Sequence, residues 1–132
     1  HALERGVRVR IIVPGPHMDS RLVQHASRAL WGELLAHGAD IHEFQTTMFH
    51  CKVMVVDGLW VSVGSTNIDS RSFSINDEAN LNVYDAAFAA SMTAIFEDDI
   101  RQSRRILLEE WQGRSWWTRT LGAAATLLES QL

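Results

Sequence analysis

The stretch FHCKVMVVDGLWVSVGSTN, from Phe49 to Asn67, decides the fold of this 132-residue chain. Two apolar runs flank the dipeptide Asp57-Gly58, which favours a type I′ turn because both central positions of that turn need a positive φ. The sequence therefore predicts a β-hairpin with a two-residue loop, in which Val56 faces Leu59. The four apolar residues at 53–56 also predict a strand that is covered on both faces.

The hairpin register predicts which polar side chains meet. Counting outward from the turn places Lys52 opposite Val63 and His50 opposite Ser65. Because directly paired residues of neighbouring strands share a face, we expect His50, Lys52 and Ser65 to point the same way. Asn67 joins them if the strand continues. A three-residue loop would shift the pairing by one residue and remove this arrangement.

This set of side chains is suited to binding an anion. A histidine and a lysine at the edge of an apolar strand need a partner, because an unpaired buried ammonium group is very costly. Lys52 can hold a phosphate oxygen, and Ser65 and Asn67 can donate hydrogen bonds to it. His50 can act as a nucleophile or a proton carrier. The hairpin therefore predicts a phosphate site.

The segments before the hairpin predict a layered α/β domain. Val7 to Pro14 reads as a β-strand, and Ile41 to Phe44 reads as another. Between them, Gly38 is expected to end a helix whose apolar residues are Leu22, Ala26, Ala29, Leu30 and Leu34. This β-α-β order favours parallel pairing of the two strands.

The segments after the hairpin predict one more strand, from Ala79 to Asp85, and then helices. One helical stripe is expected to contain Phe88, Met92, Ile95, Phe96, Ile100, Leu107 and Trp111. A further helix after Gly113 is expected to carry Trp116, Trp117, Leu121, Leu127 and Leu128. The tryptophans and arginines from Trp111 to Gly122 are assigned to core packing, and a lipid headgroup boundary is the alternative.

Composition limits the remaining possibilities. The length favours a single domain over residues 1–132, and the net charge of −4 gives no general attraction to nucleic acid. The lone cysteine, Cys51, excludes an intramolecular disulfide. Because no apolar run approaches the roughly 20 residues that span a bilayer, a soluble piece is expected. The chain begins with His1, and Gly6 would close a helix turn there, so we expect a fragment of a longer protein.

Other kinds of phosphate or catalytic site fit less well. Lys52 has no Gly-rich loop before it, so the P-loop is excluded. Zinc ligands cannot be assembled from Cys51 and scattered histidines. A triad of Ser65, His50 and Asp57 is disfavoured because VGSTN lacks the second glycine of a nucleophile elbow.

A family resemblance rests on the pattern H-x-K-x4-D-x6-G-S-x-N, which is fulfilled by His50, Lys52, Asp57, Gly64, Ser65 and Asn67. It resembles the signature of the phospholipase D superfamily. The flanking segments RGVRVRIIVPG and NIDSRSFSINDEANLNVYD, with the closing helices, are similar to the C-terminal half of bacterial cardiolipin synthases. The resemblance implies a mixed β-sheet flanked by helices, one half of a two-motif enzyme, and no metal or other cofactor.

The resemblance also implies roles for the site residues. One motif's histidine attacks phosphorus to give a phosphohistidine, and the other's protonates the leaving alcohol and then deprotonates the acceptor. In a C-terminal half, His50 is expected to be this catalytic acid and base. Lys52 and Asn67 would bind phosphoryl oxygens, with Ser65 in the same pocket. Glu78 would orient the histidine of the opposite motif.

Two members of the motif are expected to be structural. The hairpin places Asp57 in the turn, where an aspartate can hold the loop, and Gly64 precedes the polar end of the second strand. Cys51 stands where a smaller residue is expected, and QTTM before the motif lacks a proline that is common there. Neither departure affects a chemical role.

The expected function is phosphodiester transfer on phospholipid, most like that of a cardiolipin synthase, which joins two phosphatidylglycerol molecules and releases glycerol. The alternatives are a phospholipase D or nuclease-type hydrolase and a catalytically silent phosphate-binding module. The partner is a second motif, from a missing N-terminal half or a homodimer, without which the chain is expected to be inactive. We expect the parent protein to contact the cytoplasmic side of the bacterial inner membrane, and nucleic acid is disfavoured.

Overall fold

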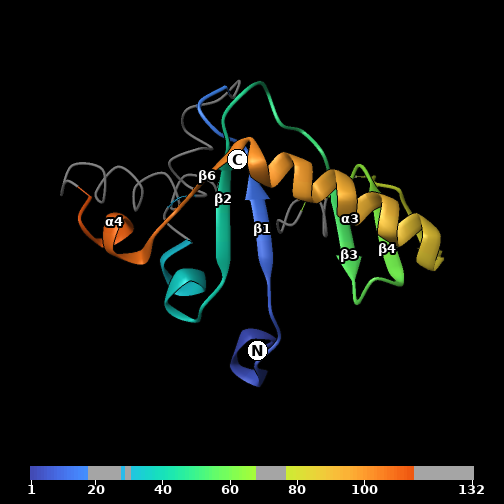
Figure 1. Cartoon of the computed structure of the whole chain (residues 1–132), viewed down its shortest axis with the longest axis horizontal. Coiled ribbons are helices and arrows are strands. Elements are labelled where there is room, and N and C mark those ends of the chain that lie inside the picture. The colour runs from blue at the N-terminus through green and yellow to red at the C-terminus, as the bar shows by residue number, and fades with distance from the viewer. Residues whose placement is uncertain (18–27, 29–30, 68–76, 115–132) are drawn as a thin grey trace. The chain divides into compact units, whose positions relative to one another are not determined.

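The computed structural model describes residues 1–17, 28, 31–67 and 77–114. Backbone contacts divide the chain into two compact units, and each contains a three-stranded sheet. Unit 1 comprises His1–Phe49 and Gln102–Leu132, and unit 2 comprises His50–Arg101. The α/β class is confirmed (Figure 1), whereas the single domain over residues 1–132 stays a prediction. The helix expected after Gly113 lies largely outside the described residues.

The sheet of unit 1 has the strand order β1-β2-β6. The strand β1 (Arg10–Val13) runs parallel to β2 (Asp40–Phe44), and β6 (Ser103–Arg105) pairs with β2 in the antiparallel direction. The predicted parallel pairing is therefore confirmed, within a mixed sheet. A short 3₁₀ turn, η1 (Leu3–Arg5), precedes β1, and Gly6 closes it at a φ of 80°.

A helix returns the chain from β1 to β2. Residues 31–36 are helical, and the helix ends at Gly38, whose φ of 87° is one that side-chain-bearing residues rarely adopt. The predicted helix end is therefore confirmed. The apolar face is rotated from the expected one, because Leu34 is 36% exposed whereas Trp31 and Leu35 are buried. The other expected apolar positions, at 22, 26, 29 and 30, lie outside the described residues.

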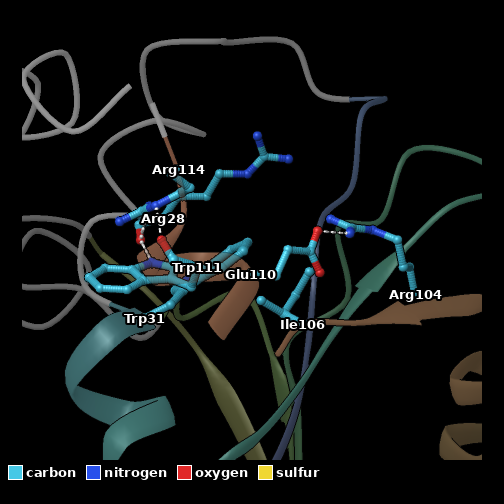
Figure 2. Close-up of a pocket in the computed structure, with 7 residues that line it drawn as sticks. All are labelled: Arg28, Trp31, Arg104, Ile106, Glu110, Trp111 and Arg114. Atoms are coloured by element: carbon cyan, nitrogen blue, oxygen red, sulfur yellow. Dashed lines mark hydrogen bonds and ion pairs between the residues drawn. The ribbon is translucent and has the colours of Figure 1, made fainter. Parts of the chain in front are cut away.

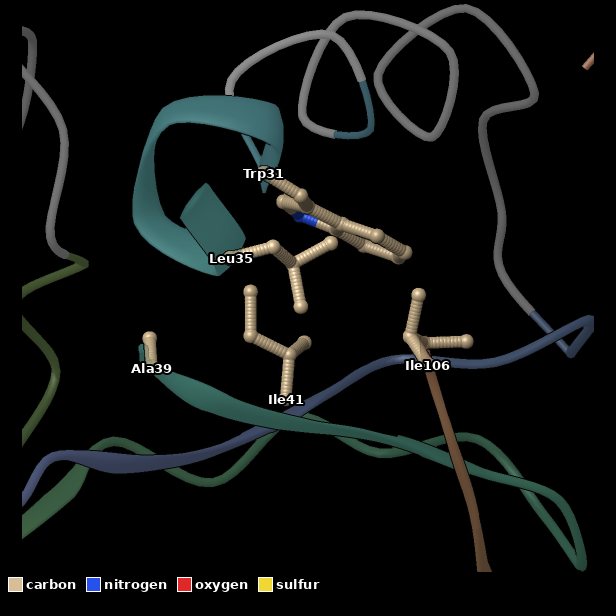
Figure 3. Packing of buried hydrophobic residues seen from close by; sticks show 5 residues of the cluster. All are labelled: Trp31, Leu35, Ala39, Ile41 and Ile106. Atoms are coloured by element: carbon tan, nitrogen blue, oxygen red, sulfur yellow. The ribbon is translucent and has the colours of Figure 1, made fainter. Parts of the chain in front are cut away.

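The core of unit 1 forms between this helix and one face of the sheet. Its buried members are Trp31, Leu35, Ala39, Ile41 and Ile106 (Figure 3). Ile41, at 1% exposed, is one of the two largest fully buried side chains among the described residues. Burying one such side chain contributes about 1.5–3 kcal/mol, so this cluster is a main source of the unit's stability.

The segment after residue 101 differs from the single helical stripe predicted from Phe88 to Trp111. The helix α3 (Ala86–Arg101) ends, and β6 and then the short helix α4 (Leu108–Gln112) follow. Pairing with β2 explains the break, because Arg105 Nε donates to Asp40 Oδ1 at 2.7 Å and the Ile106 amide donates to the Ile41 carbonyl at 2.9 Å. Tertiary contacts therefore override the local helical period.

Unit 2 is an antiparallel meander covered by a helix. Its strands β3 (Val53–Val56), β4 (Trp60–Gly64) and β5 (Asn80–Tyr84) pair in sequence order. The helix α3 packs against β3 and β4. Asp85 caps its start, because the Asp85 carboxylate accepts a hydrogen bond from the Phe88 amide at 2.7 Å.

The first strand of unit 2 is less covered than its sequence predicts. Three of the four apolar residues of β3, namely Val53, Met54 and Val56, have exposed fractions between 41% and 46%. The expectation that β3 is covered on both faces is therefore wrong for this structure. In the described part of the chain, no helix is both long and apolar enough to cross a bilayer.

Candidate active site

The motif begins and ends at the open end of the β3–β4 hairpin. At its closed end, Asp57 and Gly58 have φ values of 50° and 63°, and the Leu59 amide donates to the Val56 carbonyl at 3.1 Å. The predicted positive φ at both turn positions is therefore confirmed. Aspartate and glycine tolerate this backbone region better than most residues, which supports the structural role expected for Asp57.

The strand register differs from the predicted one by one residue. Val56 pairs with Trp60 and Val53 pairs with Val63, so three residues, 57–59, connect the strands. Leu59 stays outside the β3–β4 ladder, and its carbonyl accepts a hydrogen bond from the Asp85 amide at 3.1 Å beside β5. This contact with the third strand explains the extra residue.

The shift changes which residues of the motif lie opposite one another. The Gly64 amide donates to the Lys52 carbonyl at 3.2 Å, so Lys52 is opposite Gly64 and not Val63. Continued in this register, Thr66 and not Ser65 would come opposite His50. The expectation that pairing alone places Ser65 on the face of His50 and Lys52 is therefore wrong. The chemical roles of these residues do not depend on that pairing and stay predictions.

His50 and Lys52 do come together. Lys52 Nζ lies 2.8 Å from Nδ1 and 2.9 Å from Nε2 of His50, and it donates to the His50 carbonyl at 3.0 Å. His50 is exposed and Lys52 is half-buried. Because Nζ is almost equally far from both ring nitrogens, neither tautomer of the imidazole is favoured by the contact. The pair presents a cation and a titratable ring at one accessible point.

Ser65 and Thr66 are fixed against the start of β5. The Ser65 amide donates to the Ala79 carbonyl at 3.1 Å, and the Ala79 amide donates to the Ser65 hydroxyl oxygen at 3.1 Å. The Thr66 amide donates to Asn80 Oδ1 at 3.2 Å, and Asn80 Nδ2 donates to the Ser62 hydroxyl oxygen at 3.3 Å. These hydrogen bonds to Ala79 and Asn80 fix the loop that carries the end of the motif, and we call them the clamp.

Asn80 is the residue of this site that sequence reasoning missed. It lies opposite Gly64 in the ladder between β4 and β5. A Cβ atom on Gly64 would lie 2.1 Å from Asn80 Oδ1 and 2.2 Å from the Ala79 carbonyl oxygen. The glycine of the motif is therefore required by close approach of the neighbouring strand. A polar residue at the start of the following strand was the available signal.

The remaining site residues lie near this clamp in the chain. Glu78 is half-buried and directly precedes Ala79, and Asn67 is exposed and follows Thr66. Cys51, between the histidine and the lysine, is exposed and free. In the described residues, no three His, Cys, Asp or Glu side chains gather where they could hold a metal ion.

A hairpin that presents a histidine and a lysine beside a fixed Gly-Ser-Thr-Asn loop, within an α/β fold, defines the class of phospholipase D-like proteins. Comparison with solved structures agrees. The phospholipase D family member Nuc from Salmonella typhimurium superposes with a TM-score of 0.71 at 25% identity, covering 80% of this chain and 68% of that one. A phosphatidylserine synthase from Haemophilus influenzae has a TM-score of 0.70 at 15% identity over 98% of this chain and 35% of its own, and supports the fold alone.

Sequence comparisons place the chain in a narrower family than the fold comparison does. Residues 1–100 match the family model described as "Cardiolipin synthase, PLD-like domain", and the chain belongs to this family. Cardiolipin synthase A of Erwinia tasmaniensis is 43% identical over 118 residues, which are 89% of this chain and 24% of that protein. A cardiolipin synthase of Halalkalibacterium halodurans is 35% identical over 127 residues, or 96% of this chain and 25% of its own. The chain thus spans about a quarter of these relatives.

Proposed function

We propose that this chain is the C-terminal catalytic part of a cardiolipin synthase, which transfers a phosphatidyl group between two phosphatidylglycerol molecules. The observation that carries the proposal is the contact between His50 and Lys52 beside the clamped Gly64–Asn67 loop. The cardiolipin synthases named among its relatives support the lipid substrate. The motif groups bind a phosphodiester and do not themselves read the alcohol attached to it.

In the proposed reaction, a histidine of a second motif forms a bond to phosphorus while the bond from phosphorus to the glycerol oxygen breaks. His50 gives its proton to that leaving oxygen, so that neutral glycerol departs. His50 then takes the proton from a hydroxyl group of the second phosphatidylglycerol, whose oxygen attacks phosphorus and releases the nucleophilic histidine. One proton and one phosphatidyl group are transferred in a closed cycle.

The other residues of the motif stabilise charge in this scheme. Lys52 and Asn67 hold the non-bridging phosphoryl oxygens, on which negative charge grows in the transition state. Ser65 lies beside them, and its hydroxyl can still donate a hydrogen bond while its oxygen accepts from Ala79. Glu78 would orient the histidine of the second motif. That motif comes from the rest of the parent protein, and a second copy of this chain is the alternative.

The test is turnover of phosphatidylglycerol vesicles by the full-length parent protein, with cardiolipin, phosphatidate and glycerol measured together. His50→Ala should lower cardiolipin formation by about 10²–10⁴-fold, as expected for loss of a general acid and base, without changing the unfolding transition. His37→Ala is the matched control, because His37 is an exposed histidine of unit 1 whose ring bonds to the Glu33 carbonyl at 2.8 Å. Cardiolipin formation unchanged by His50→Ala would refute the role of His50, and phosphatidate alone would make the parent a hydrolase.

We also propose that the parent protein works at the cytoplasmic side of the bacterial inner membrane, because both proposed substrates are membrane lipids. Fractionation of cells that carry the parent protein tests this placement. Recovery with inner-membrane vesicles, in which a protease added from the cytoplasmic side cleaves the chain, is the expected result. Recovery in the supernatant after ultracentrifugation would contradict it.

A further inference from the structure

Unit 1 contains a pocket that shares no residue with the motif. Its volume is about 190 Å³, and its walls are Arg28, Trp31, Arg104, Ile106, Glu110, Trp111 and Arg114 (Figure 2). Such a volume is below the usual range of about 300–1,000 Å³ for pockets that hold drug-sized molecules, so it would hold one small group. The predicted core packing of Trp111 is confirmed, since it contacts the buried cluster, but this does not explain three arginines at one cavity.

One side of the pocket is apolar and aromatic. Trp31 and Ile106 are 7% and 6% exposed and belong to the buried core. The Arg114 guanidinium lies 3.8 Å from the centroid of the Trp111 ring, within the range of a cation–π contact. These rings can pack against carbon atoms of a ligand while the guanidinium groups meet its charge.

The other side is cationic, and a buried carboxylate fixes it. The Glu43 side chain is 4% exposed, and it accepts hydrogen bonds from Arg28 and, at 3.4 Å, from Arg104 Nη2. The backbone adds to this order, because the Arg28 carbonyl accepts from Trp111 Nε1 at 2.8 Å and from Arg114 Nη1 at 3.3 Å. Cations held in place before binding lose less entropy when a ligand arrives.

Most of the charged side chains that line the pocket are cationic. Among the described residues, three guanidinium groups line it, and Glu110 is the carboxylate in its lining, while the buried Glu43 accepts hydrogen bonds from Arg28 and Arg104. Glu110 pairs with Arg104, and its side chain is 50% exposed. The bond to Glu110 raises the pKa of Arg104 above its ordinary value, against the opposing effect of burial, so this group stays charged. An exposed carboxylate that pairs with a held arginine can be replaced by an incoming anion.

We propose that this pocket binds a phosphate-bearing anion with a carbon flank, such as the phosphoglycerol end of a phospholipid, and that the anion displaces Glu110 from Arg104. Guanidinium groups match phosphate oxygens through paired hydrogen bonds, and the tryptophan wall accommodates the carbon portion. The site is a second anion site of the chain, and it does not rest on the function of His50.

Binding is tested on the 132-residue chain by two-dimensional NMR of the tryptophan indole N–H groups, because Trp111 Nε1 is bonded at the pocket. The probes are inorganic phosphate, sn-glycerol 3-phosphate and dihexanoyl phosphatidylglycerol below its micelle concentration. We expect the Trp111 indole signal to shift in a saturable way that weakens with salt. Saturation by all three probes would indicate a site for the phosphate group, and saturation by the lipid alone a site for the intact headgroup with its chains.

The variants give opposite signs, which a purely structural pocket would not. Glu110→Gln should tighten binding about three- to tenfold, because it removes the competing carboxylate from Arg104. Arg114→Gln should weaken binding about tenfold through loss of a charge-assisted contact. Arg101→Gln is the matched control, since this exposed arginine pairs with Asp98 in unit 2 and should change nothing.

Three results would overturn the proposal. One is absence of any Trp111 shift with every probe up to about 10 mM, a concentration that corresponds to less than about 3 kcal/mol of binding. Another is an unchanged or weaker affinity in Glu110→Gln, provided that circular dichroism shows the variant folded. The third is loss of the indole shift in His50→Ala, which would place the anion at the motif instead. Because His50→Ala should leave this pocket intact, failure of the proposed catalytic role would leave the binding result unchanged.

Discussion

Replacing Gly64 by alanine tests the geometry of the candidate active site at its tightest point. A Cβ atom at this position would lie 2.1 Å from Asn80 Oδ1, 2.2 Å from the Ala79 carbonyl oxygen and 2.7 Å from Asn80 Cα. The side-chain oxygen could rotate away, but the other two atoms belong to the backbone of the paired strand. The strands β4 and β5 would therefore have to separate at the end that carries the motif loop.

The size of the effect follows from these contacts. Forcing one extra carbon into a filled space costs about 1–3 kcal/mol. Movement of Asn80 would also break its hydrogen bond from the Thr66 amide, with a net loss of about 0.5–1.5 kcal/mol. Gly64→Ala should therefore lower the free energy of unfolding by about 2–4 kcal/mol. Activity of the parent protein should fall further than stability alone explains, because the Ser65–Asn67 loop moves.

Urea unfolding of the 132-residue chain measures the first effect, and phosphatidylglycerol turnover by the parent protein measures the second. Gly113→Ala is the control. Gly113 has a φ of −72°, and a Cβ atom there would lie 3.3 Å from the Glu109 carbonyl oxygen, a contact that a small shift relieves. The urea midpoint of Gly113→Ala should therefore change far less than that of Gly64→Ala. A Gly64→Ala chain that unfolds at the wild-type urea concentration, in a protein of wild-type turnover, would show that β5 does not approach Gly64 closely.

Three further substitutions test the contacts on both sheets. Asn80→Ala should lower the free energy of unfolding in urea by about 1–2 kcal/mol, because it removes the hydrogen bonds to Thr66 and Ser62. An unchanged urea midpoint would show that Asn80 does not hold the loop. Glu43→Gln should lower the free energy of unfolding by about 2 kcal/mol. This is less than the loss of about 3–5 kcal/mol that follows from breaking a fully buried ion pair, because the Arg104 side chain is 48% exposed. A stabilised variant would contradict this expectation. Burial raises the pKa of the Asp40 carboxyl, but His42 and Arg105 outweigh it and hold the pKa below its usual 3.8. The stability that the ionised Asp40 contributes is therefore fully present above that pH, so Asp40→Asn should cost about 1 kcal/mol at pH 7. The difference from the wild type should vanish as the pH falls from about 4 through the lowered pKa. A constant difference down to about pH 2 would refute this reasoning.

Much of the fold could be predicted because its signals are local. The turn at Asp57-Gly58 and the helix end at Gly38 follow from backbone preferences of single residues. The parallel pairing of β1 with β2 follows from the β-α-β order of neighbouring elements. The strand β6 could not be predicted in this way, because its three residues lie within the segment for which a helical stripe was predicted. What makes them a strand is the pairing of Arg104 and Arg105 with carboxylates of β2, far away in the sequence.

The candidate site shows the same division between local and distant causes. The spacing of His50 and Lys52 was enough to predict that they share a face, since residues two apart in an extended segment do so, and their side chains are in contact in the structure. Asn80 was missed because its role depends on which strand lies beside Gly64. The backbone preferences of residues near the turn do not determine which strand lies beside Gly64.

The register error shows why a correct turn does not fix a hairpin. Both turn residues have the expected positive φ, and the hydrogen bond that closes the turn is present, yet the strands pair one residue later. The extra residue, Leu59, is explained by its bond to Asp85 beside β5, so the third strand determines how the first two align. The same strand excludes a side chain at Gly64 and holds the Ser65 hydroxyl. The fixed spacing from Asp57 to the Gly-Ser pair therefore records the fit of the hairpin to β5, as well as the chemistry of the residues that the motif presents.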